Sequence, residues 1–257
     1  MPSLSKFILI LTLLATTLAK SDYKVVKEVR NTTAIVLTLS YTGTDDYFIK
    51  ESSPIIKTLL FTFHTHTFFD FSFKITDPNH KRFEVPQYGV FPIDPEADFS
   101  FPIANAAVAF EFTQSPFDFR IIRKQNGAIL FSTYNQKVIY SDHYLEIGTE
   151  VDSEYIYGIG ERFQSSFKKG EGKWTVFNRD RGQVIDRGQG LQTYGYFPFY
   201  MLRERNNLFH INYLRSSNAM DVIKSTSDDR HYLTFKVIGG IIDFRFFLGE
   251  QNPENTL

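Results

Sequence analysis

The stretch FDFSFKI, residues 69–75, places an apolar residue at every second position, with Asp, Ser and Lys between them. Strict alternation of this kind is typical of a β-strand with one buried face. The same period of two returns in residues 108–112 (VAFEF) and 117–121 (FDFRI). These stretches predict strands whose aromatic side chains form one side of a hydrophobic core.

Working outward from them, we expect further strands wherever β-branched and aromatic residues cluster between turn residues. They cover residues 34–41, 56–63, 128–131, 137–140, 207–213, 232–237 and 241–248. Asn126-Gly127 lies between two of the strands and tolerates the positive φ angles of a type I′ turn, so it is the clearest hairpin, and Asp228-Asp229 is a second predicted turn.

Helical patterning is weak throughout the chain. No stretch of twelve residues sustains an apolar stripe of helical period, and residues 103–110, the best helical alternative, continue better as a strand. Residues 77–102 and 163–190 are expected to form two long irregular connections, which in a compact domain are usually functional or disordered. Many short strands and almost no helix predict an all-β fold, either a sandwich or a barrel.

Composition narrows the functional class. The chain has 257 residues, of which 42% are hydrophobic, with 27 Phe, 14 Tyr and no Cys. This content is enough for a large core, and the lack of cysteine excludes disulfides, cysteine metal sites and thiol nucleophiles. The net charge of −1 carries no basic block, which argues against a nucleic-acid partner or an anionic membrane surface.

The first nineteen residues have the pattern of a secretory signal peptide. Lys6 precedes the apolar run FILILTLLA, and Thr17-Leu18-Ala19 offers a small-residue cleavage site after Ala19. The alternative, an uncleaved anchor, needs a longer apolar run to cross a bilayer. We therefore expect a domain over residues 20–257 that follows the secretory route without a membrane span. Asn31-Thr32-Thr33 is a predicted glycosylation acceptor.

Familiar catalytic motifs are absent from the sequence. Gly158-Ile159-Gly160 suggests a dinucleotide fingerprint, but Phe163 occupies the position of its third glycine. No spacing marks the carboxylate pair that a glycosidase needs. His64 and His66 share a strand face and could bind a metal, although such a pair is more typical of a solvated face. We therefore predict no catalytic residue, no metal ligand and no cofactor.

An ordered series of motifs carries more information than any of them alone. In chain order it reads YGIGE (157–161), Trp174, FNRD (177–180), YG with FPFYM (194–201), SNAMDV (217–222) and IGGIIDF leading to FLG (238–249). This series, together with the hairpin at 116–131, resembles the N-terminal domain of glycoside hydrolase family 31, the α-glucosidase family. The resemblance spans residues 20–257 and implies an antiparallel β-sandwich of the galactose-mutarotase-like type.

The resemblance also implies one substrate contact. In this family the loop with Asn-Arg-Asp reaches over the catalytic barrel, and its aspartate, here Asp180, hydrogen-bonds sugar hydroxyls. An ionised carboxylate accepts such bonds well. The alternative for Asp180 is a solvated loop charge paired with Arg179 or Arg181. Trp174 is expected to pack the loop against the sandwich rather than to stack on a sugar, and the other motifs are expected to be structural, with glycines at bulges and turns.

This sequence departs from the family in one respect that matters for activity. The catalytic aspartates of the family lie on the barrel that follows this domain, and the sequence ends at Leu257. We therefore expect a fragment or truncated product, non-catalytic alone, whose partners are an α-glucoside or oligosaccharide and a barrel normally in the same chain. Its compartment is expected to be extracellular, lysosomal or the lumen of the endoplasmic reticulum. The alternatives are a free-standing carbohydrate-binding module and, third, a sugar mutarotase.

Overall fold

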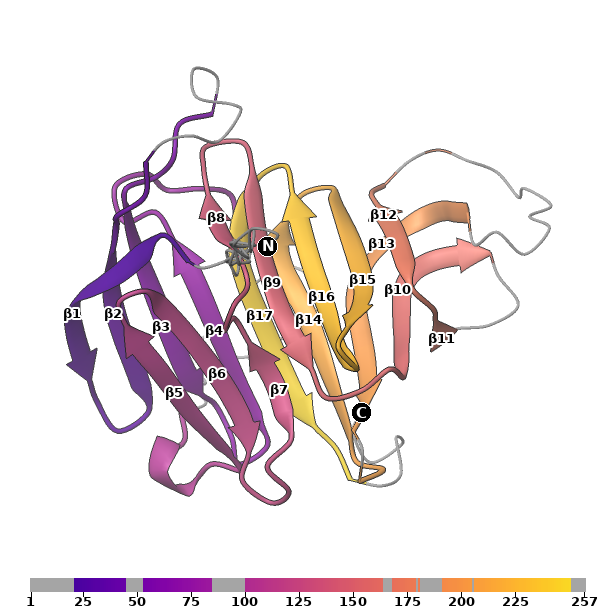
Figure 1. Ribbon diagram of the computed structural model, residues 1–257, viewed down its shortest axis with the longest axis horizontal. Coiled ribbons are helices and arrows are strands. Elements are labelled where there is room, and N and C mark those ends of the chain that lie inside the picture. Colours follow the sequence, from indigo (N-terminus) through magenta and orange to yellow (C-terminus); the bar gives the residue numbers. More distant parts are fainter. Residues whose placement is uncertain are drawn as a thin grey trace, which may run out of the picture.

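The computed structural model describes residues 21–44, 53–84, 100–163, 168–178, 180, 191–204 and 206–250. Two antiparallel sheets face each other across this part of the chain (Figure 1), which confirms the predicted antiparallel β-sandwich. The signal peptide predicted for residues 1–19 lies outside the described residues.

Nine of the described strands form the first sheet, in the spatial order β1-β2-β3-β4-β17-β14-β13-β10-β11. The order shows that the C-terminal strand β17 lies beside β4 and completes the sheet between its N-terminal and central strands. The bounds are β1 (Tyr23–Arg30), β2 (Ala34–Tyr41), β3 (Thr58–Thr65), β4 (Asp70–Thr76), β17 (Gly240–Leu248), β14 (Phe209–Ser217), β13 (Leu191–Arg203), β10 (Ile156–Phe163) and β11 (Lys168–Lys169).

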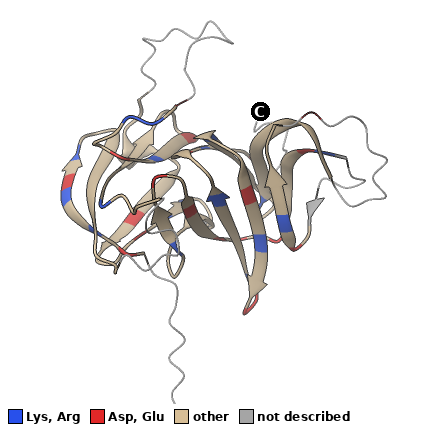
Figure 2. Ribbon diagram, turned by 90° about the horizontal axis from the view of Figure 1, so that it is seen from above, with Lys and Arg blue, Asp and Glu red and all other residues tan. Residues whose placement is uncertain are grey.

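The second sheet has the order β12-β15-β16-β9-β7-β6-β5, and β8 pairs with β9 off this path. Its bounds are β12 (Gly172–Val176), β15 (Met220–Ser227), β16 (Arg230–Val237), β9 (Leu145–Val151), β7 (Ile129–Ser132), β6 (Phe117–Arg123), β5 (Val108–Gln114) and β8 (Val138–Tyr140). Lys/Arg and Asp/Glu are interspersed over the described ribbon, so neither sign of charge dominates a face of Figure 2.

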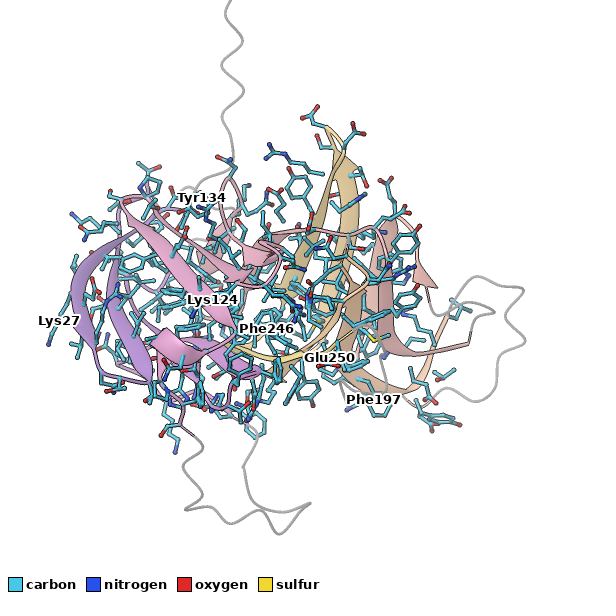
Figure 3. The ribbon with its side chains drawn as sticks, turned by 90° about the horizontal axis from the view of Figure 1, so that it is seen from below. Lys27, Lys124, Tyr134, Phe197, Phe246 and Glu250 are labelled. Carbon is cyan, nitrogen blue, oxygen red and sulfur yellow. The ribbon has the colours of Figure 1, made fainter. Side chains whose placement is uncertain are left out.

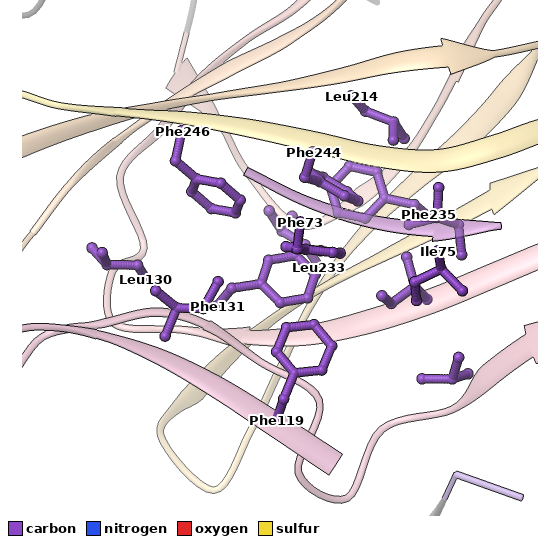
Figure 4. Packing of buried hydrophobic residues seen from close by; sticks show 14 of the residues in the cluster. Phe73, Ile75, Phe119, Leu130, Phe131, Leu214, Leu233, Phe235, Phe244 and Phe246 are labelled. Carbon is purple, nitrogen blue, oxygen red and sulfur yellow. The ribbon is translucent and has the colours of Figure 1, made fainter. Parts of the chain in front are cut away.

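Phenylalanine rings from the two sheets meet in the core. Phe73 of β4 lies with its ring centroid 5.0 Å from that of Phe119 and 4.9 Å from that of Phe131, both on the opposite sheet. On its own sheet it also packs against Phe61 and Phe244. Figure 4 shows these side chains pointing toward one another between the layers. Such contacts combine burial of large apolar area with favourable edge and offset ring geometry.

The alternation in the sequence predicts the buried face correctly. In β4 the side chains of Phe71, Phe73 and Ile75 are at most 1% exposed, whereas Phe69 precedes the strand and is 44% exposed. Phe117, Phe119 and Ile121 of β6 are fully buried. Phe69 departs from the pattern because it lies in the turn between β3 and β4, where alternation no longer applies.

The type I′ turn lies at Asp228-Asp229 rather than at Asn126-Gly127, where it was predicted. The hairpin at Asn126-Gly127 is confirmed, but only Gly127 has a positive φ, 74°, and the amide of Arg123 bonds the carbonyl of Ala128, so the loop has four residues. The type I′ assignment there is wrong. Asp228 and Asp229 instead have φ of 49° and 59° between the paired residues Ser227 and Arg230, which is the type I′ pattern.

The expectation of one irregular connection over 163–190 is wrong for its described part, which contains β11 and β12. Strand β12 pairs with β15, a partner some fifty residues later, and its side chains are mostly exposed, so it lacks the alternation of a half-buried strand. Edge strand β1 was missed for the same reason. Residues 103–110 contain only a three-residue 3₁₀ turn, Ile103–Asn105, before β5 begins at Val108.

We expect Phe73→Ala to lower the free energy of unfolding by about 3–5 kcal/mol, because it removes a ring at the centre of the core and leaves a cavity. Denaturant unfolding of the variant and of Phe68→Ala measures this. Phe68 is 47% exposed, so its variant is the matched control and should lose much less stability. Equal losses in the two variants would contradict the central role of the ring layer.

Candidate functional site

The loop that leaves β12 is anchored at its root by one buried amide. The side chain of Gln192, on β13, is 3% exposed and bonds Phe177 at both backbone groups: its Oε1 accepts from the Phe177 amide at 3.0 Å, and its Nε2 donates to the Phe177 carbonyl at 2.6 Å. The Nε2 also donates to the carbonyl of Gly195 at 3.1 Å. Gln192 therefore holds the end of β12 against β13, because its side-chain amide pairs with the backbone of Phe177 as a neighbouring strand would.

Asp180 lies three residues beyond this anchor, and its side chain is exposed. Arg179 and residues 181–190 lie outside the described residues, so the alternative pairing of Asp180 with Arg179 or Arg181 is not tested. The structure thus brings the predicted sugar-binding carboxylate to the surface close to a fixed point. Its role as a substrate contact stays a prediction.

The motif at 157–161 shapes the strand beside this loop. Strand β10 pairs with β13 through two register shifts, on either side of Gly160. Gly158 has φ +101°, and a Cβ there would lie 2.6 Å from the Phe199 carbonyl oxygen, so only glycine fits. The carboxylate of Glu161 accepts a hydrogen bond from the Gly195 amide at 3.1 Å. These contacts confirm that the motif is structural.

Two other motif residues have structural positions. Trp174 is partly buried and packs against the hydrophobic core, as expected for a residue that joins the loop to the sandwich. Gly240 has φ +84°, and a Cβ there would lie 2.2 Å from the Ser216 carbonyl oxygen at the bulge between β14 and β17.

A buried ionic cluster, which the sequence analysis missed, closes the other end of the sandwich. Arg123 and Glu204 are each 2% exposed, and the Arg123 Nε donates to the Glu204 Oε2 at 2.9 Å. His210 Nδ1 lies 3.0 Å from the Glu204 Oε1, and Asn126 Nδ2 donates to the Oε2 at 2.9 Å. Arg123 also donates to the carbonyls of Phe209 and Gly249. Local sequence carries no signal for this cluster, because the Arg123 guanidinium and the Glu204 carboxylate lie 81 residues apart in the chain.

The surroundings of Glu204 determine its ionisation. Burial alone would raise the pKa of its carboxyl group. The hydrogen bond and charge of His210, with the hydrogen bonds from Arg123 and Asn126, outweigh burial and lower the pKa from 4.5 to about 2. Glu204 is therefore ionised over the physiological range and is a poor proton donor. The cluster links three segments and has the character of a structural tie.

A groove of about 920 Å³ lies next to this tie. Phe68 and Phe69, each nearly half exposed, line one part of it, and Lys124, Gly249 and Glu250 line another. Lys124 and Glu250 are both visible in the view of Figure 3. The Lys124 ammonium donates to the carbonyls of Ala104 and Ala106, so it holds the wall of the groove.

The remaining predicted positions lie apart from the loop. Asn31 is exposed in the turn between β1 and β2, where its Oδ1 accepts from the amides of Thr33 and Ala34, and its glycosylation stays a prediction. His64 and His66 approach each other with their Nδ1 atoms 3.0 Å apart. Among the described residues no three His, Cys, Asp or Glu side chains gather in one place, and no helix has the length and apolar character to cross a bilayer.

Comparison of sequences finds enzymes much longer than this chain. No family model matches. The chain is 34% identical over 232 residues to the lysosomal acid alpha-glucosidase of Tetrahymena pyriformis, an alignment that covers 88% of the chain and 24% of the relative. It is 37% identical over 212 residues to the intestinal sucrase-isomaltase of Suncus murinus, covering 79% and 11%. The chain thus spans a quarter or less of these relatives.

Comparison of structures finds the same fold. The glucosidase II alpha subunit superposes with a TM-score of 0.66 at 12% identity, covering 90% of this chain and 33% of that one. A GH31 dextranase from Flavobacterium johnsoniae, in complex with isomaltotriose, superposes with a TM-score of 0.61 at 12% identity, covering 89% and 26%. At such identities the likeness concerns the fold alone.

We expect the Glu204 carboxylate to stabilise the fold in a pH-dependent way. Its pKa is depressed in the folded state, so its contribution is complete above pH 4.5 and is lost as the pH falls toward 2. The shift corresponds to about 3 kcal/mol. Glu204→Gln should therefore unfold more easily at pH 7 and lose less stability than the parent on acidification.

Unfolding curves in denaturant between pH 7 and pH 2.5 measure this difference. Glu111→Gln is the control, because Glu111 pairs with Arg120 at the exposed surface and contributes little there. If the free energy of unfolding falls equally with pH in the parent and in Glu204→Gln, the buried carboxylate titrates normally and the prediction is wrong.

Proposed function

Since the chain belongs to glycoside hydrolase family 31, we propose that it forms the N-terminal, substrate-rim β-sandwich of an α-glucosidase-like enzyme. In this proposal the domain binds α-glucosides or oligosaccharides together with a catalytic barrel normally in the same chain, and it does not hydrolyse them alone. The single observation that carries the sugar contact is the clamp at Gln192, which fixes the root of the loop and presents Asp180 to solvent.

The outer face of the nine-stranded sheet supports the barrel as a partner. Phe197 on β13, Tyr213 on β14 and Phe247 on β17 are 59%, 38% and 36% exposed and lie on three neighbouring strands. Phe197 stands at the outside of the ribbon in Figure 3, while Phe246, the buried neighbour of Phe247 in β17, lies among packed side chains. Clustered exposed aromatic residues of this kind mark a surface that another protein layer covers.

A secretory compartment fits both the leader pattern of residues 1–19 and the relatives. Two of the relatives are named as lysosomal, from Tetrahymena pyriformis and from Rattus norvegicus. We therefore place the protein in the secretory pathway, with the lysosome, the lumen of the endoplasmic reticulum and the exterior as its possible destinations.

The described carboxylates favour a non-catalytic domain. Glycoside hydrolysis needs two carboxyl groups flanking an accessible bond, one of them protonated. Glu204 is closed to solvent and paired with His210 and Arg123, so no sugar reaches this His–carboxylate pair. The same closure disfavours a mutarotase that would use it.

We expect the isolated chain to release no p-nitrophenol from p-nitrophenyl α-glucoside above a heat-denatured control. Joined to the catalytic domain of a family 31 relative, it should support turnover. Turnover by the isolated chain would overturn the non-catalytic assignment. Glucoside binding by the isolated chain in calorimetry would favour the free-standing module, and accelerated anomer interconversion would favour the mutarotase.

In that joined enzyme we expect Asp180→Ala to lower kcat/KM for maltose about ten- to a hundredfold, since it removes a charge-assisted hydrogen bond worth about 1.5–3 kcal/mol. Steady-state kinetics with disaccharides and aryl glucosides measure the effect, which should vary with the aglycone. Glu171→Ala is the control, because Glu171 is another exposed carboxylate in the same connection. If both variants match the parent, the loop does not touch substrate.

A further inference from the structure

His64 and His66 form a close pair at the end of β3. Their side chains are partly exposed and alternate with the buried Phe63 and Thr65, so they lie on the outer face of the nine-stranded sheet. The two Nδ1 atoms are 3.0 Å apart, and the ring planes are inclined at 70° with centroids 4.4 Å apart. The two Nδ1 atoms are hydrogen-bonded to each other, so one of them carries the proton and the other accepts it.

Ser72 of β4 orients one ring of the pair. It lies opposite His64 in the register of β3 and β4, and its Oγ is 2.8 Å from the His66 Nε2. When the Nε2–H donates to this hydroxyl, the Nδ1 of His66 carries the lone pair and faces His64. A hydrogen bond to the second ring nitrogen is the usual way in which proteins set the tautomer of a metal-binding histidine.

We propose that the Nδ1 atoms of His64 and His66 chelate a divalent transition-metal ion, with Cu²⁺ bound most tightly and Ni²⁺ next. At metal–nitrogen distances of about 2.0–2.1 Å, a right angle at the metal places the nitrogens about 2.9 Å apart and a tetrahedral angle about 3.3 Å. The separation of 3.0 Å fits the right angle. Square-planar or tetragonal nitrogen sites select Cu²⁺ and Ni²⁺, and Cu²⁺ leads the affinity series.

The neighbouring positive charge of Arg245 is neutralised, so it does not repel a cation from the histidine pair. Arg245 lies beside Ser72 on β17, but its guanidinium pairs with the carboxylate of Asp70, with the Nε 3.0 Å from the Oδ1. The two imidazoles supply two of the ligands of the proposed site, and folding of the sandwich does not depend on the metal.

Isothermal calorimetry of the whole, untagged chain with Cu²⁺ and with Ni²⁺ tests the proposal. We expect one ion per chain, stronger binding of Cu²⁺ than of Zn²⁺, and a loss of about tenfold or more in affinity for either His64→Gln or His66→Gln, because each removes one arm of the chelate. Ser72→Ala should weaken binding by about tenfold through the orientation of His66. The electron paramagnetic resonance spectrum of the Cu²⁺ form should show two nitrogen ligands.

His143→Gln is the matched control, because His143 is an exposed histidine paired with Asp142 rather than with a second imidazole. Denaturant unfolding of each variant without metal verifies that the fold is kept. The proposal is overturned if His64→Gln and His66→Gln bind Cu²⁺ like the parent, if His143→Gln loses as much affinity as they do, or if the spectrum shows fewer than two nitrogens.

Discussion

Contact between phenylalanine rings of the two sheets is the interaction on which the rest of the structure depends. The chain has no cysteine, so no disulfide contributes to its stability. Across the layers, the ring centroid of Phe73 lies 5.0 Å from that of Phe119 and 4.9 Å from that of Phe131. The centroids of Phe119 and Phe131, which belong to the same sheet, are 5.7 Å apart. Because a shift of one residue in any of these strands would turn its rings to solvent, the same contacts also fix the register.

Because the core of the sandwich is filled, the groups that can contact a partner lie at its ends and on its outer face. At one end Gln192 attaches the departing loop to β13 through backbone groups, so the position of Asp180 follows from the sheet rather than from the loop's own sequence. At the other end the side chain of Arg123 joins the carbonyls of Phe209 and Gly249. The buried side chains of Gln192 and Arg123 are hydrogen-bonded to these groups, which holds the segments in place without enlarging the hydrophobic core.

Sequence reasoning succeeds where one face of a strand is buried, because alternation is then visible in a few residues. It predicted the inward face of β4 and β6, and the ordered motifs pointed to the family. It failed for β1 and β12, whose exposed side chains have no period to detect. It also missed β9, β10, β13 and β15; the buried residues of β9 and β15 include the polar Thr149 and Lys224, which weaken the apolar pattern. It also missed the contact of Gln192 with Phe177 and that of Glu204 with Arg123, because these residues are 15 and 81 positions apart and only the fold brings them together. The turn at Asn126 was assigned the wrong type because Asn126 does not adopt the positive φ that a type I′ turn requires.

The two histidine clusters show why contact geometry, rather than residue type, separates a structural role from a binding role. His210 lies against a carboxylate that is already bound by Arg123 and Asn126, and His210, Glu204 and Arg123 are each 2% exposed. Every lone pair of that carboxylate has a donor from the protein, so a ligand has nothing to replace. His64 and His66 face each other at a partly exposed surface, with one ring oriented from behind by Ser72. A proton or a metal ion can lie between the nitrogens of His64 and His66, so this pair is a candidate for binding. The cluster around Glu204 is a fixed part of the fold.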